Sequence, residues 1–258
     1  MPLRIGFDMD GVLADFSLAF HEVEERLFGP GPGVTAGQPE KEEEAQEESE
    51  AEATLKGHPA AADVEGEEDP ATLKGRPTTE DDGPTPRQAR RRRDSIWQAI
   101  QSTPNFWETL KPIDEGAVAR IHALMLRHKW EVFFITQRPK TDGDTVQRQT
   151  QRWLVAQGFD LPSVLVLGGS RGAAAGALRL NYHIDDSAQN CIDVIFESRA
   201  KPILIVPDSD EKTVASARKL GIGSARTISE CLDILEQATI AHTQPGLLSR
   251  LASLVGWR

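Results

Sequence analysis

Apolar residues along the chain form two kinds of pattern that alternate. Short continuous apolar runs, which indicate strands buried on both faces, lie at residues 3–7, 131–136, 164–167, 182–184 and 203–206. Apolar residues at helical spacing lie between or beside them, at 16–28, from about 114, and at 145–157, 188–196 and 212–220. This alternation predicts an α/β fold with a Rossmann-like parallel sheet and helices on both faces.

The pattern stops between residues 30 and 93. No aromatic residue occurs from Gly29 to Ile96, and Pro, Gly, Ala and Glu dominate. Between Gln38 and Gly83 there are 16 acidic and 4 basic residues, a net charge of −12, and the motif ATLKGxP occurs twice with a period of 18 residues. Such a stretch cannot bury enough apolar surface to offset an ordering cost of about 1–2 kcal/mol per residue. We expect residues 30–93 to be a disordered acidic insert.

The composition of the rest of the chain excludes several classes. The total charge of the 258 residues is −11, so without the acidic stretch the rest carries +1, and the acidity says nothing about partners of the folded part. The two cysteines form no CxxC pair, which excludes a disulfide framework. The first residues do not have the pattern of a signal peptide, and no apolar run is long enough to span a membrane. We therefore expect a cytoplasmic protein without membrane or nucleic-acid partners. A homodimer is left open.

Acidic and hydroxyl residues follow the expected strands. Asp8 and Asp10 come after the first run, Thr136 ends the second, and Asp185 and Asp186 follow the run at 182–184. The carboxyl ends of parallel strands meet at one edge of a sheet, so these carboxylates should converge there. They cannot all stay ionised without a cation, and oxygen-only ligands favour Mg²⁺ as the cofactor.

Three of these segments resemble signatures of the haloacid dehalogenase superfamily. They are FDMDGVL at residues 7–13, FFIT at 133–136 and IDD at 184–186, in the order of that family. The resemblance implies that Asp8 is the nucleophile that forms an aspartyl-phosphate and that Asp10 is the general acid and base. It also implies that Thr136 binds a phosphoryl oxygen. Asp8, the backbone carbonyl of Asp10, and Asp185 or Asp186 would hold Mg²⁺.

One signature departs from the family pattern. Where the family has a Lys, this chain has Arg171, within GGSRG at residues 168–172. Arginine binds phosphate through two donors at once but is larger and differently shaped than lysine. Arg171 is therefore the expected phosphate-binding cation, and Arg148, Arg152 or Arg179 are alternatives.

A narrower resemblance is to the 5'(3')-deoxyribonucleotidase (type C) family, through PNFWETLKP at residues 104–112 and TQRP at 136–139. It implies a small helical cap whose aromatic residues stack on the nucleobase, so Phe106 and Trp107 are the expected substrate-binding residues. The alternative is that this pair belongs to the core of the cap. The expected domains are a core at 1–14 and 114–240, a cap at 15–29 and 94–113, the insert at 30–93, and a C-terminal amphipathic helix at 241–258.

The sequence thus predicts a Mg²⁺-dependent phosphomonoesterase whose partner is a small phosphorylated substrate, preferentially a 5'-nucleotide. Two alternatives remain open: a phosphatase of the same fold that acts on another ester, such as a sugar phosphate, and a non-catalytic binding protein that uses the acidic insert to recruit a partner.

Overall fold

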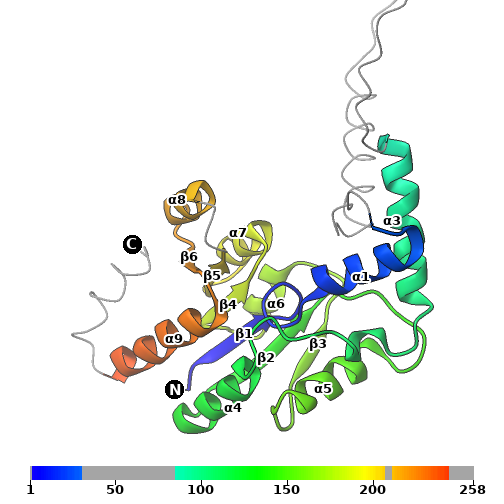
Figure 1. Ribbon diagram of the computed structural model, residues 1–258. Coiled ribbons are helices and arrows are strands. Elements are labelled where there is room, and N and C mark those ends of the chain that lie inside the picture. Colours follow the sequence, from blue (N-terminus) through cyan, green and yellow to red (C-terminus); the bar gives the residue numbers. More distant parts are fainter. Residues whose placement is uncertain (1, 31–84, 207–210, 244–258) are drawn as a thin grey trace, which may run out of the picture.

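The centre of the molecule is a six-stranded parallel sheet, seen in a computed structural model that describes residues 2–30, 85–206 and 211–243 (Figure 1). In chain order the strands are β1 (Arg4–Asp8), β2 (Glu131–Thr136), β3 (Val164–Val166), β4 (Tyr182–Asp185), β5 (Lys201–Ile205) and β6 (Gly223–Ala225). They are arranged in the order β3-β2-β1-β4-β5-β6, and every neighbouring pair is parallel. The predicted Rossmann-like α/β fold is confirmed.

The direction of winding reverses beside β1. From β1 the chain moves outward to β2 and β3, and it then returns to build β4, β5 and β6 on the other side. Phe7 of β1 therefore has Phe134 of β2 on one side and Ile184 of β4 on the other. In open α/β sheets, ligands bind outside the carboxyl ends of the strands at such a reversal. Asp8 and Asp185 end the two strands that flank it.

Helices cover both faces of the sheet. On one face lie α4 (Ala117–His128), α5 (Val146–Ala156) and α9 (Ile228–Thr243), and on the other lie α6 (Arg171–Ala177), α7 (Ala188–Glu197) and α8 (Glu211–Lys219). Neighbouring strand residues serve opposite faces. Phe134 packs in the α4 and α9 cluster, whereas Ile135 packs with α6 and α7. Continuous apolar strands are the consequence of this two-sided burial.

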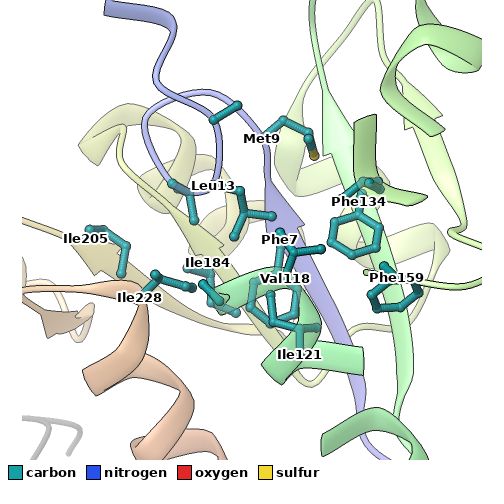
Figure 2. Close-up of a cluster of buried hydrophobic side chains, with 14 of the residues drawn as sticks. Phe7, Met9, Leu13, Val118, Ile121, Phe134, Phe159, Ile184, Ile205 and Ile228 are labelled. Carbon is teal, nitrogen blue, oxygen red and sulfur yellow. The ribbon is translucent and has the colours of Figure 1, made fainter. Parts of the chain in front are cut away.

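The larger core cluster supports the edge of the sheet that carries the acidic residues. In Figure 2, Phe7 and Phe134 from the sheet meet Ile121 of α4. The ring of Phe159 meets Phe134 edge-on, with 4.8 Å between the ring centroids. Burying a side chain of this size stabilises the fold by about 1.5–3 kcal/mol. Asp8 follows Phe7 directly, so its backbone is fixed by this packing.

Two helices, α1 (Phe16–Phe28) and α3 (Pro86–Gln101), stand beyond the carboxyl end of β1 (Figure 1). The 3₁₀ turn η1 (Phe106–Glu108) follows α3 in the chain. The side chain of Asp15 caps α1 by accepting a hydrogen bond from the backbone N–H of Leu18. Phe20 of α1 meets Trp97 of α3 edge-on, at 6.1 Å between centroids. Helix α1 and the turn η1 fall within the segments expected to form the cap, whereas α3 extends beyond them.

The start of α3 requires a correction. Residues 86–93 were expected to belong to the insert and the cap to resume only at Asp94, but α3 begins at Pro86. Thr85 and Gln88 form a capping box, and a proline in the first turn favours a helix start. Arg92 then pairs with Glu24 of α1 at 2.8 Å. The run of arginines is thus part of the helix that packs on α1.

The other expectations vary in outcome. The helix at 16–28 is confirmed with the same bounds, and the strand expected at 203–206 runs from 201 to 205. The elements α6, β6 and α9 were not predicted. Residues 31–84 of the expected insert and 244–258 of the expected C-terminal helix lie outside the described residues, and 241–243 belong to α9. Among the described helices, none has the length and apolar character needed to cross a bilayer.

Candidate active site

The acidic residues predicted from the sequence gather around one cavity. Asp8, Asp10 and Asp186 line it, together with Arg171, and its volume is about 400 Å³. We call this cavity the site pocket. Its remaining lining residues are Gly11, Phe16, Ser17, Trp97, Trp107, Gln137, Arg138, Pro139, Ser187 and Asn190.

Thr136 and Asp185 do not line the site pocket, although they end the strands on either side of β1. Their exposed fractions are 1% and 0%, compared with 5% for Asp8. Of the residues predicted to bind phosphate, the structure therefore places Arg171 on the pocket wall and leaves Thr136 buried beside it.

Arg171 contacts the expected nucleophile. It is the first residue of α6, whose N-terminus is capped by Ser170. Its Nη2 donates to Oδ1 of Asp8 at 2.5 Å, and its Nε lies 3.7 Å from Oδ2 of Asp185. Both Nε and Nη1 are buried and have no hydrogen-bond partner within the described residues. Unused buried donors are costly, so a guanidinium in this state is suited to bind phosphoryl oxygens.

The three alternative arginines lie elsewhere. Arg152 pairs with Glu108 at 3.0 Å and with Asp144 at 2.6 Å. Arg148 also approaches Asp144, at 3.5 Å, and Arg179 lines a separate cavity beside α6 and α7. None of the three is on the wall of the site pocket.

Burial and crowding shift the acidity of the pocket carboxyl groups. Burial raises the pKa of Asp8 well above its usual value, and the carboxylate of Asp185 raises it further, against the opposing effect of Arg171. Partial desolvation of its carboxyl, followed by the charge of Asp185, raises the pKa of Asp186 from 3.8 to about 7. Both carboxyl groups therefore bind a proton more tightly than a free carboxyl does, and a cation in the pocket would favour their ionised forms.

Asp185 is held as an anion by its neighbours. It accepts hydrogen bonds from the backbone N–H of Ser187 at 2.9 Å and from Asn190 Nδ2 at 3.0 Å, and His183 Nε2 lies 3.0 Å away. Burial alone would raise the pKa of Asp185, but His183 and then Arg171 bring it below the usual value. The N-cap residue of α7 is Ser187, so neither Asp185 nor Asp186 occupies the N-cap position of that helix.

Gly11 brings Asp186 into the pocket. Its φ is +77°, a conformation that side chains rarely adopt, and a Cβ atom at this position would overlap the carboxylate of Asp186. The glycine that follows Asp10 therefore allows the loops after β1 and β4 to approach each other.

Asp10 is paired with a residue that was not predicted as a site residue. Arg138 Nε donates to Oδ2 of Asp10 at 2.9 Å, and its Nη2 donates to Oδ1 at 2.7 Å. Arg138 follows Thr136 by two residues, just as Asp10 follows Asp8. Loops after adjacent parallel strands lie side by side, and this equal offset was the available signal in the sequence.

The aromatic residues of the pocket differ in part from those predicted. Trp107 lines the pocket but is only 1% exposed, and Arg138 covers one face of its ring at 4.8 Å. Phe106 lies in a different cavity, beside α1. Phe16 is partly buried, lines the pocket and stacks on Trp97, with 5.4 Å between centroids. Neither Phe16 nor Trp97 was predicted as a substrate-binding residue.

The chemistry of the donor set fits a hard divalent cation. The pKa values of Asp8 and Asp186 are both raised, first by burial and then by the charge of Asp185. Among the described residues, no three Asp, Glu, His or Cys side chains form a ready-made metal cage. Mg²⁺ does not need one, since it is usually bound through one or two carboxylates, with water and substrate phosphate completing its shell. Asp8, the backbone carbonyl of Asp10, and Asp185 or Asp186 are the residues that would hold it.

Several solved structures are similar to this chain. A haloacid dehalogenase-like hydrolase from Streptococcus pneumoniae is 14% identical, with a TM-score of 0.49, over 91% of this chain and 98% of that one. A family IA hydrolase of the same type from Entamoeba histolytica is 13% identical, with a TM-score of 0.41, over 89% and 95%. For a 2-haloacid dehalogenase from Pseudomonas syringae the values are 14%, 0.41, 92% and 99%.

These structures bear the name of the superfamily that the three sequence motifs resemble. No protein-family model matches the chain, and no curated protein does. The resemblance to type C nucleotidases stays a prediction. What the protein does is therefore argued from the site pocket itself.

Proposed function

We propose that the protein is a Mg²⁺-dependent phosphomonoesterase that acts through an aspartyl-phosphate on Asp8. The observation that carries this proposal is the pair of Asp8 and Arg171 on one pocket wall. Arg171 engages Oδ1 of Asp8 and keeps Nη1 unpaired among the described residues. A phosphoryl group bound by Arg171 would therefore lie close to the carboxylate of Asp8.

The reaction needs two steps. In the first, Oδ2 of Asp8 attacks phosphorus, the bond from phosphorus to the leaving oxygen breaks, and Asp10 gives that oxygen its proton. In the second, Asp10 takes a proton from water, the water oxygen attacks phosphorus, and the bond to Asp8 breaks to release phosphate. When bound, Mg²⁺ would neutralise charge on the transferring group.

The pocket also supports the narrower proposal that the substrate is a nucleoside monophosphate. Phe16, backed by Trp97, is an aromatic surface that lines the pocket together with Asp10. Stacking of a base on such a ring contributes about 1–3 kcal/mol in other nucleic-acid sites. Trp107 would then support this wall from within, and the predicted role of Phe106 would require the separate cavity beside α1 to open.

A sugar phosphate remains the second candidate. The hydroxyl of Ser17 and the amides of Gln137 and Asn190 also line the pocket and could bind the hydroxyl groups of a sugar. Release of phosphate with and without Mg²⁺ should be measured over nucleoside monophosphates, sugar phosphates and p-nitrophenyl phosphate. Higher kcat/KM for nucleotides supports the nucleotidase proposal. Absence of phosphate release from every ester would refute the catalytic proposal and leave a non-catalytic binding role.

A further inference from the structure

Arg138 is the most completely enclosed charged residue of the site pocket. Its side chain has no exposed surface, whereas 25% of the side-chain surface of Asp10 remains open. Each of its three guanidinium nitrogens already donates a hydrogen bond. Nε and Nη2 donate to Asp10, and Nη1 donates to Thr150 Oγ1 at 2.9 Å. The guanidinium carbon lies over the ring of Trp107, 4.8 Å from the ring centroid.

Trp107 is itself fixed on two sides. Its indole N–H donates to the carbonyl of Pro139 at 3.0 Å, and its backbone N–H donates to Oε1 of Gln149 at 3.1 Å. Arg138 therefore stands between two immobile supports, the indole from η1 and the hydroxyl of Thr150 from α5. A guanidinium held by α5, η1 and Asp10 has little freedom to follow a substrate. Its donors serve the carboxylate, while Arg171 has the unused donors.

We propose that Arg138 is a positioning residue that holds the carboxylate of Asp10 in the orientation needed for proton transfer. This inference rests on the proposed function, because it gives Asp10 the acid and base role. The two-point bond fixes both the direction and the rotation of the carboxylate, which one lysine ammonium could not do. Trp107 and Thr150 act through Arg138, so the cap contributes to catalysis by fixing an arginine.

The test compares leaving groups. Arg138→Met keeps an unbranched side chain but removes the two-point bond to Asp10. In single-turnover experiments, which measure the first step alone, release of thymidine from thymidine 5'-monophosphate, whose alkoxide must be protonated, should slow about 10²-fold. Release of p-nitrophenolate, a stable leaving group, from p-nitrophenyl phosphate should slow less than about tenfold. Arg138→Lys should lie between Arg138→Met and the wild type. Arg148→Met, on the exposed surface of α5, is the matched control and should change neither rate.

A double-mutant cycle separates positioning from general disruption of the fold. If Arg138 acts through Asp10, then Arg138→Met should have almost no further effect on kcat in an Asp10→Asn background. Equal losses for both substrates, together with additive losses in the double variant, would overturn the proposal.

Crystal structures of the wild type and of Arg138→Lys keep the proposal testable if Arg138→Met does not fold, or if the wild type releases no phosphate from any ester. Wild-type inactivity would refute the proposed function alone. A carboxylate of Asp10 that turns away or becomes disordered in the variant supports positioning by Arg138. A carboxylate in the same orientation in both structures refutes it.

Discussion

The two carboxylates of the first motif are both paired with an arginine, but the two pairs differ in completeness. At the Asp8 end of the pocket, Arg171 makes one short hydrogen bond and leaves two buried nitrogens without partners among the described residues. At the Asp10 end, all three nitrogens of Arg138 donate, and an indole covers the guanidinium. The guanidinium of Arg171 thus has unused donors, whereas all three nitrogens of Arg138 are engaged.

This difference indicates that a ligand should bind at the Asp8 end of the pocket. Buried unsatisfied donors and a raised carboxyl pKa both cost stability in the free protein, and a bound phosphoryl group with a cation would relieve both. The Asp10 pair gains nothing comparable from a ligand. We therefore expect changes at the Asp8 end to remove binding and chemistry together, and changes at the Asp10 end to remove only the steps that move a proton.

The largest expected effect is that of Asp8→Asn. A neutral amide cannot attack phosphorus, so kcat should fall by about four orders of magnitude or more for every ester, whatever its leaving group. Asp10→Asn should in contrast spare p-nitrophenyl phosphate relative to thymidine 5'-monophosphate in the first, phosphoryl-transfer step. Single-turnover release of the leaving group measures this step. Substantial turnover by purified Asp8→Asn would refute the covalent mechanism.

Arg171→Met should have the next largest effect. Loss of one preorganised donor to a transition-state oxygen typically costs about 10²–10³ in kcat, and Arg171 offers such donors to phosphate. Arg171→Lys restores the charge and should recover part of the rate. Arg199→Met removes an exposed arginine and serves as the control. If Arg171→Met keeps the wild-type kcat/KM, phosphate must be bound by other residues.

The fold could be predicted largely because its signals are local. Residues 16–28 carry a helical pattern that ends at Gly29, and the continuous apolar runs located five of the six strands. The helix α6 was not predicted because its sequence, RGAAAGA, has no apolar periodicity. Its packing depends on small residues. A Cβ on Gly172 would overlap the backbone of Asp193 in α7. Such close approach is a property of the pair of helices, and one segment does not reveal it.

The site could be predicted in part for the same reason. Strand ends placed Asp8, Asp10 and Asp185 at one edge, since that follows from the parallel sheet alone. Which side chain each would contact does not follow, because it depends on rotamers and on the relative height of the loops. Arg138 and Phe16 were missed on this account. Phe106 and Trp107 are adjacent in sequence, yet they line different cavities because the 3₁₀ turn points their side chains apart.

Substitution of Phe16 tests whether the pocket recognises a base. Phe16→Leu should lower kcat/KM for nucleoside monophosphates by about 5- to 150-fold, the equivalent of about 1–3 kcal/mol of stacking. Phosphate esters without a ring should be affected little. Phe106→Leu removes an aromatic ring from the other cavity and is the matched control. Should Phe16→Leu affect both classes equally, this ring belongs to the core of the cap and the nucleotide preference loses its structural support.

The smallest effect concerns the cation and pH. In the metal-free protein the carboxyl of Asp186 binds its proton more tightly when folded, with a pKa of about 7 against 3.8. Its contribution to stability is therefore present below about pH 4 and is lost as pH rises through about 7. Mg²⁺ prefers the ionised carboxylates, so its stabilisation should grow over the same range. At pH 8 and ten times its Kd, it should add about 1.4 kcal/mol, or about 3–6 °C in Tm.

Thermal unfolding at pH 5 and pH 8, with and without Mg²⁺, measures this effect. The increase in Tm should be clearly larger at pH 8, and calorimetry at pH 7 should detect protons released on binding, because Asp186 is then about half protonated. Asp186→Asn should reduce the pH dependence, whereas Asp160→Asn, an exposed carboxyl far from the pocket, should not. An equal increase at both pH values would mean that Mg²⁺ does not meet the crowded carboxylates at the Asp8 end. The incomplete pair would then be completed by phosphate alone.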